Sequence, residues 1–195
     1  MRARIRTAVS ARPFTQDKFG WSPWVEPLAP GAATLQQEAA LPGPKATSPY
    51  YRLLARDTPV LLARTAVDKG IFRTRGGLPR GERELAAVVA SRVNGCVYCA
   101  SVHARFASTY TGRRDDVRRL LDEGVEAEQD ARWRGLIDFV ALLSQTPSRA
   151  ELTDLAALRR LGLSSLEVLD AVQSSAFFAW ANRLMLTLGE PEVAD

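Results

Sequence analysis

The chain has 195 residues and a mass of 21.4 kDa, which suits one domain with or without a tail. With 46% hydrophobic and 25% charged residues it can bury a core, which excludes disorder throughout. The net charge of +4 comes almost entirely from arginines interleaved with acidic residues, as in residues 113–123, so no basic stripe indicates nucleic-acid binding. No apolar run reaches the roughly 20 residues that span a bilayer, and the basic start lacks the apolar stretch of a secretory signal. We therefore expect a cytoplasmic protein that binds neither nucleic acid nor membrane.

Residues 1–32 are expected to form an irregular arm, followed by a single all-α domain over residues 33–195. Prolines interrupt any helix in the arm, yet its aromatic residues are too apolar for a free tail. These aromatic residues are Phe14, Phe19, Trp21 and Trp24. We expect the arm to lie across its own domain or across a neighbouring subunit.

Beyond the arm, helix-start signals recur and strand patterns are nearly absent. Thr34 begins a capping box, and Ser48-Pro49 supplies an N-cap residue followed by proline at the first helical position. Thr58-Pro59 does the same for a helix expected to end near Lys69-Gly70. A loop is then expected over Ile71–Gly77.

The second half of the chain continues the helical pattern. A helix that starts at Leu78-Pro79 should end at Asn94-Gly95, and another should run from about Cys96 to Tyr110. Further helices are expected near 114–123, 127–145, 153–161 and 165–187, the last opened by a capping box at Ser164. The fold class predicted from these signals is an all-α bundle.

Both cysteines and the only histidine lie within eight residues of one another. Cys96 and Cys99 are spaced i, i+3, and Cys99 and His103 are spaced i, i+4, so all three share one face of a helix that starts near Gly95. The first turn of a helix stabilises an anion through its unpaired N–H groups and its dipole. This placement should lower a cysteine pKa and increase the reactivity of that thiol.

Glu84 reaches the same place only if the chain reverses. It lies ten residues before Asn94, and His103 lies eight residues after Gly95, so an antiparallel hairpin would bring the carboxylate close to the imidazole. A carboxylate, an imidazole and two thiols together can move protons to and from sulfur.

Three other interpretations of these residues stay open. The cysteines could form a structural disulfide, although the short loop and a reducing cytosol disfavour it. Glu84, Cys96, Cys99 and His103 could bind a metal, although structural zinc sites usually take ligands from two separated pairs. Finally, the cysteines could be inert core residues.

The pattern Glu, eleven residues, Cys-x-x-Cys, three residues, His resembles the alkylhydroperoxidase D-like branch of the carboxymuconolactone decarboxylase superfamily, within its peroxidase-related group. Glu84, Cys96, Cys99 and His103 meet every spacing, and the close match covers about residues 48–110. The resemblance implies an alkylhydroperoxidase D-like helical bundle with the Cys-x-x-Cys motif at a helix N-terminus. It also implies that Cys99 attacks the peroxide, that Cys96 resolves the sulfenic acid, and that Glu84 and His103 relay protons.

Two further residues are candidates for positions beside the reacting groups. Tyr98 stands where alkylhydroperoxidase D itself carries a histidine, and a phenol cannot replace imidazole as a base at neutral pH. Asn182 occupies the position of Cys99 when residues 167–186 are compared with residues 84–103, a weak internal similarity.

The resulting hypothesis is a thiol-dependent peroxidase that reduces a hydroperoxide, needs no cofactor or metal, and is reset by a dithiol of unknown identity. One rival is a disulfide oxidoreductase acting on proteins or small thiols, and another is a non-enzymatic metal-binding or redox-sensing module. The resemblance further implies a homo-trimer or homo-hexamer, in keeping with the many apolar aromatic residues in the arm and near Trp180.

Overall fold

The computed structural model describes residues 13–193, and helices dominate them. The first helices are α1 (Leu35–Ala39), α2 (Pro49–Leu54), α3 (Thr58–Arg73), α4 (Arg80–Val93) and α5 (Val97–Thr111). They are followed by α6 (Arg114–Glu123), α7 (Ala131–Leu143), α8 (Leu152–Arg160) and α9 (Ser165–Leu188). Short 3-10 helices cover Gly43–Ala46 and Ala55–Asp57, and two strands, β1 (Phe19–Pro23) and β2 (Gly189–Val193), complete the fold.

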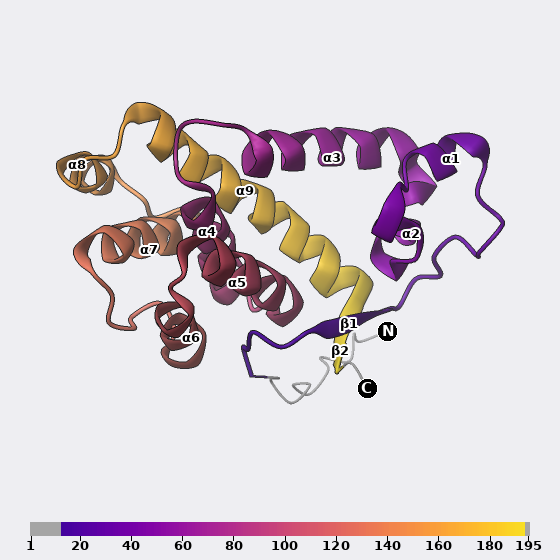
Figure 1. Cartoon of the computed structure of the whole chain (residues 1–195), viewed down its shortest axis with the longest axis horizontal. Helices are drawn as coiled ribbons and strands as arrows, with labels where there is room; N and C mark the ends of the chain where they lie inside the picture. Colours follow the sequence, from indigo (N-terminus) through magenta and orange to yellow (C-terminus); the bar gives the residue numbers. More distant parts are fainter. Residues whose placement is uncertain (1–12, 194–195) are drawn as a thin grey trace, which may run out of the picture.

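The centre of the molecule is the antiparallel pair α4 and α5, against which α9 packs (Figure 1). α4 is buried along nearly its whole length, from Gly81 to Ser91. α3 runs beside α9 on one side, α6, α7 and α8 lie at one end, and α1 and α2 lie at the other. No helix within residues 13–193 is long and apolar enough to cross a membrane.

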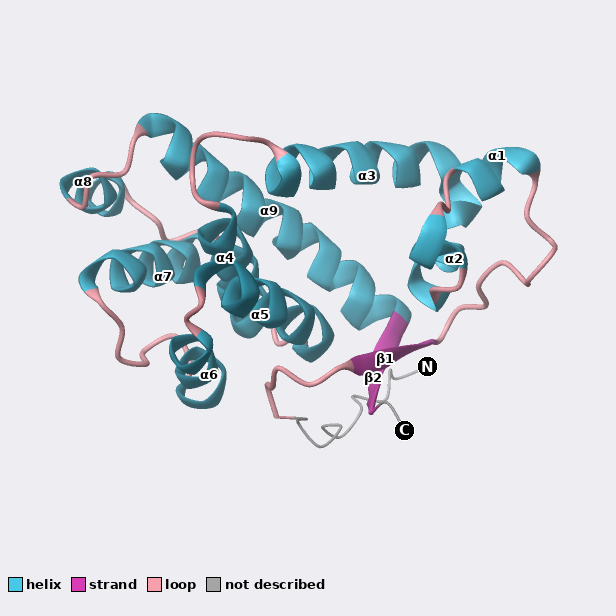
Figure 2. Cartoon of the chain, viewed as in Figure 1, coloured by secondary structure: helices cyan, strands magenta, loops and turns pink. Residues whose placement is uncertain are grey.

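The expectation of a wholly irregular arm is wrong for residues 19–23. They form β1, which pairs antiparallel with β2, so that Trp21 faces Pro191 (Figure 2). Trp21 is buried, and its indole N–H donates a hydrogen bond to the carbonyl of Met185 at 3.3 Å. This part of the arm therefore lies across its own domain, whereas residues 1–12 fall outside the described residues. The strands escaped prediction because each is short and gains its partner from the opposite end of the chain.

Most of the expected helices are present, with shifted ends. The capping boxes predicted at Thr34 and Ser164 are confirmed. The helix expected to stop near Lys69-Gly70 instead continues to Arg73, and the loop begins at Thr74. Ile71 and Phe72 are buried, and their burial outweighs the low helix propensity of the glycine.

Candidate functional site

The turn between α4 and α5 positions the Cys-x-x-Cys motif at the start of α5. Gly95 has a φ of +77°, a left-handed conformation that glycine adopts without steric cost. The Cys96 N–H donates to the carbonyl of Ser91 at 2.9 Å, and the Cys96 carbonyl accepts from Ala100 at 3.0 Å. Cys96 is thus the N-cap residue of α5, and Cys99 lies in the first helical turn.

The same turn brings Glu84 and His103 together. Glu84 Oε2 lies 2.6 Å from His103 Nδ1, and Glu84 Oε1 accepts a hydrogen bond from Arg80 Nε at 3.2 Å. Only 1% of the Glu84 side chain is exposed, so both carboxylate oxygens are held inside the protein. The His103 ring also packs on Phe178, with 4.1 Å between ring centroids. The contact expected across the Asn94-Gly95 turn is confirmed, and it leaves Nε2 as the imidazole nitrogen open to other partners.

Both cysteines are buried free thiols, and they influence each other's ionisation. A hydrogen bond from the Cys99 thiol lowers the pKa of Cys96. The same hydrogen bond, together with burial, raises the pKa of Cys99 well above its usual range. Of the two thiols, Cys96 is therefore the one with the lowered pKa, and the principal cause is the partner thiol.

The two additional candidates lie close to the motif: Asn182 contacts both thiols, and Tyr98 lines a cavity beside them. Asn182 is completely buried in α9, donates to Ser91 Oγ at 3.1 Å and accepts from Asn94 Nδ2 at 3.0 Å. Its side chain also hydrogen-bonds both thiols and favours their charged forms. Burial raises the pKa of Tyr98, which keeps its phenol protonated.

A cavity of about 150 Å³ opens beside the motif. Cys99, His103 and Tyr98 line it from α5, and Phe178 and Met185 line it from α9. Cys96 does not belong to its wall. The sulfur that a small molecule in this cavity meets is therefore Cys99, in the company of the imidazole.

Three residues of this wall were missed by sequence reasoning: Tyr50 and Tyr51 from α2 and Arg64 from α3. Arg64 is buried, and it follows Leu61 by three residues on the face of α3 that also carries Asp68 and Ile71. An arginine on an apolar helical stripe is the one signal that could have drawn attention to it.

Within residues 13–193, no three His, Cys, Asp or Glu side chains are grouped closely enough to hold a metal ion. The four residues of the motif instead form two pairs, Glu84 with His103 and Cys96 with Cys99.

Both the sequence and the fold resemble those of known proteins. Residues 59–142 match the model of the carboxymuconolactone decarboxylase family. A peroxidase-related protein from Ralstonia eutropha JMP134, described as an alkylhydroperoxidase AhpD core, is 26% identical over 71% of this chain and 74% of its own, with a TM-score of 0.65. A peroxidase-related protein from Silicibacter sp. TM1040 is 27% identical over 72% and 74% of the two chains, also at 0.65. Over residues 59–142 the chain thus resembles the carboxymuconolactone decarboxylase family, and its fold is that of alkylhydroperoxidase D-like, peroxidase-related proteins.

A protein of different chemistry also shares this fold. The debrominase Bmp8 shares the fold at 19% identity, covering 84% of this chain and 89% of its own with a TM-score of 0.68. None of the curated proteins matches the chain significantly. The part of the chain that matches the carboxymuconolactone decarboxylase family contains Arg64 and the four residues of the motif, whereas Tyr50 and Asn182 lie outside it.

Proposed function

We propose that this protein is a thiol-dependent peroxidase that reduces hydroperoxides through a Cys96–Cys99 dithiol/disulfide cycle. The observation that supports it most is the shared cavity of Cys99 and His103, with Glu84 holding the imidazole from behind. Likeness to peroxidase-related proteins favours the same chemistry. No cofactor is needed, because the two thiols supply both electrons.

The cycle begins with a proton shift inside the thiol pair. The hydrogen bond donated by the Cys99 thiol lowers the pKa of Cys96, so Cys96 is the sulfur of the pair that carries a negative charge more readily. Movement of the Cys99 proton along this hydrogen bond produces a thiolate on the sulfur that lines the cavity. Cys96 thus acts first as the base for Cys99 and later as the resolving thiol.

Peroxide reduction follows in two steps. The Cys99 thiolate attacks the terminal peroxide oxygen, the O–O bond breaks, and His103, held by Glu84, supplies the proton that the departing alkoxide takes. The Cys96 thiol then attacks the Cys99 sulfenic acid, so that an S–S bond forms, the S–O bond breaks and water leaves. An external dithiol returns two electrons and two protons to the disulfide.

The decisive experiment is stopped-flow oxidation of the reduced protein by hydrogen peroxide and tert-butyl hydroperoxide, with free thiols counted afterwards. We expect two thiols to be lost per peroxide. Cys99→Ser should abolish the reaction. Cys96→Ser should react once, more slowly because the base for Cys99 is lost, and stop at the sulfenic acid. An unreactive Cys96→Ser protein beside a Cys99→Ser protein that consumes one equivalent would reverse the two roles. A protein inert to both peroxides that exchanges rapidly with disulfides would instead be a disulfide oxidoreductase.

A further inference from the structure

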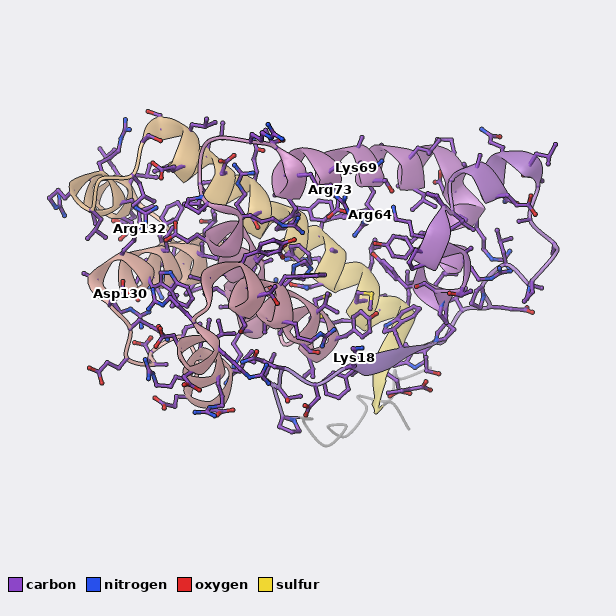
Figure 3. The ribbon with its side chains drawn as sticks, in the orientation of Figure 1. Lys18, Arg64, Lys69, Arg73, Asp130 and Arg132 are labelled. Atoms are coloured by element: carbon purple, nitrogen blue, oxygen red, sulfur yellow. The ribbon has the colours of Figure 1, made fainter. Side chains whose placement is uncertain are left out.

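Arg64 is a buried cation on the wall of the cavity. Its side chain extends from α3 toward α9 (Figure 3), and its guanidinium lies 5.2 Å from the ring centroid of Tyr51 and 5.1 Å from that of Phe177. Only 7% of the side chain is exposed. Asp68 Oδ2 lies 3.5 Å from Nη1, and among the described residues no hydrogen-bond acceptor is in place for Nη1 or Nε.

The Tyr50 hydroxyl is in the same situation. Tyr50 is 6% exposed and lines the same cavity. The Arg64 guanidinium beside it can donate to its oxygen, but among the described residues no acceptor is in place for the proton of its hydroxyl. A buried donor without an acceptor costs about 1–3 kcal/mol, and more if it is charged. Two such donors on one wall indicate that the acceptor is a ligand, and a carboxylate accepts from a guanidinium and a phenol at once.

The surroundings also favour an anion. Lys45 Nζ lies 4.9 Å from the ring centroid of Tyr51 and hydrogen-bonds Thr65 at 3.1 Å. Lys69 and Arg73 follow Arg64 along α3 (Figure 3), but both are exposed and neither lines the cavity. Among the residues that line the cavity, Arg64 is the one Arg, Lys, Asp or Glu, so a ligand there meets a positive charge, which favours an anion.

We infer that the cavity binds a small carboxylate group through Arg64 and Tyr50, and that the preferred hydroperoxides are therefore short ones that carry a carboxylate. The second part rests on the proposed function, whereas carboxylate binding beside Cys99 does not. The volume of about 150 Å³ equals about five water molecules at roughly 30 Å³ each, which restricts the ligand to a few non-hydrogen atoms. Arg64 and Tyr50 are substrate-binding residues in this arrangement.

Alkylation tests the site without any peroxide. Reduced Cys96→Ser protein is treated with iodoacetate or with iodoacetamide. The two reagents have the same shape, but the first carries a carboxylate where the second carries an amide. In both reactions the Cys99 sulfur forms a bond to the methylene carbon and iodide leaves. Mass spectrometry follows both rates. The accessibility and the pKa of Cys99 affect the two rates equally, so their effects cancel in the ratio.

We expect Arg64→Gln to lower the iodoacetate-to-iodoacetamide ratio about tenfold or more, the effect of a lost charged hydrogen bond. Tyr50→Phe should lower the ratio severalfold. Arg64→Lys, which keeps the charge, should lower the ratio less than Arg64→Gln does. Arg73→Gln is the matched control: it removes one positive charge from an exposed position on α3 and should leave the ratio within about twofold.

A ratio that is unchanged in Arg64→Gln, or that falls equally in Arg73→Gln, would overturn carboxylate binding. Circular dichroism will show whether the Arg64→Gln protein is folded. If it is not, the Cys96→Ser protein with Arg64 retained is alkylated by iodoacetamide in the presence of acetate or of acetamide. At equal ionic strength, acetate should slow the alkylation more than acetamide does. Loss of that difference would also overturn the site. A retained iodoacetate preference in a protein inert to peroxides would refute the peroxidase function and leave the carboxylate site standing.

Discussion

At the scale of single residues, Glu84 is the buried charge on which the site depends. One oxygen of its carboxylate contacts His103 on α5, and the other accepts a hydrogen bond from Arg80, one turn earlier on α4. The side chain is almost completely shielded from solvent. A buried carboxylate is stable only with such partners, and here the partnership also fixes the orientation of the imidazole. Glu84 acts through His103, so it is a positioning residue.

Glu84→Gln should slow oxidation of Cys99 by peroxide by about 10²-fold, the usual effect of disturbing an acid–base partner, while the cysteines still form a disulfide with a small oxidant. His103→Ala should have a similar effect, and the double variant should be little worse than either. Single-turnover stopped-flow rates measure all three, with Glu123→Gln on the exposed surface of α6 as the control. Fully additive losses, or a Glu84→Gln protein at the unmodified rate, would remove Glu84 from the mechanism.

The thiol pair makes a second prediction at this scale. Because the hydrogen bond from Cys99 is the main cause of the lowered pKa of Cys96, Cys99→Ala should raise the pKa of Cys96. The rise of thiolate absorbance with pH should then move to higher pH than in the unsubstituted protein. Cys99→Ser, which keeps a hydroxyl donor, should move it less. A titration that does not shift in Cys99→Ala would mean that the helix N-terminus alone stabilises the thiolate.

At the scale of elements, the loop before α4 is tied to α9 by one buried ion pair. Arg83 is 2% exposed, and its guanidinium donates to the carbonyls of Ile71, Thr74 and Gly76 and to Asp170 Oδ2 on α9. Asp170 Oδ2 also accepts from the Leu78 N–H at 2.9 Å. This junction sets the position of α4, and therefore of Glu84, relative to α9 and Asn182.

Asp170→Ala should lower the free energy of unfolding by about 3 kcal/mol, because it leaves a buried guanidinium without its carboxylate. Asp115→Ala is the control, since the pair that Asp115 forms with Arg118 is solvent-exposed and is expected to contribute less than about 0.5 kcal/mol. Urea unfolding followed by circular dichroism measures both. Equal, small losses in the two variants would show that the Arg83 junction adds no net stability.

At the scale of the whole molecule, the aromatic residues that suggested an oligomer are mostly covered within one chain. Trp21, Phe177 and Phe178 are buried, whereas Trp24 and Trp180 remain 48% and 38% exposed. Trp180 lies beside Val60 and Val67 of α3, which are also exposed, so α3 and α9 together present an apolar face.

The prediction of a homo-trimer or homo-hexamer now rests on the superfamily resemblance and on this face of α3 and α9. Light scattering at micromolar concentration should return three or six times 21.4 kDa. Val67→Glu, which places a charge on the face, should reduce the mass toward that of one chain, whereas Glu123→Gln should not. A mass of one chain for the unsubstituted protein would contradict the prediction.

Local signals in the sequence sufficed for the helices and for the contact of Glu84 with His103. Capping residues and the Asn94-Gly95 turn act over a few residues, and helical periodicity then decides which side chains share a face. The same residues carry the superfamily motif, so the sequence alone determined the fold class and the four candidate site residues.

Only the tertiary structure decided which sulfur meets the cavity, which thiol has the lowered pKa and what else lines the wall. Cys99 faces the space bounded by α2, α3 and α9, and Asn182 and Arg64 reach the thiols and the cavity from helices far away in the sequence. The pairing of β1 with β2 likewise joins the two ends of the chain. Burial and the pKa of a thiol depend on every neighbour in space, and long-range packing brings those neighbours together without leaving a periodic pattern in the sequence.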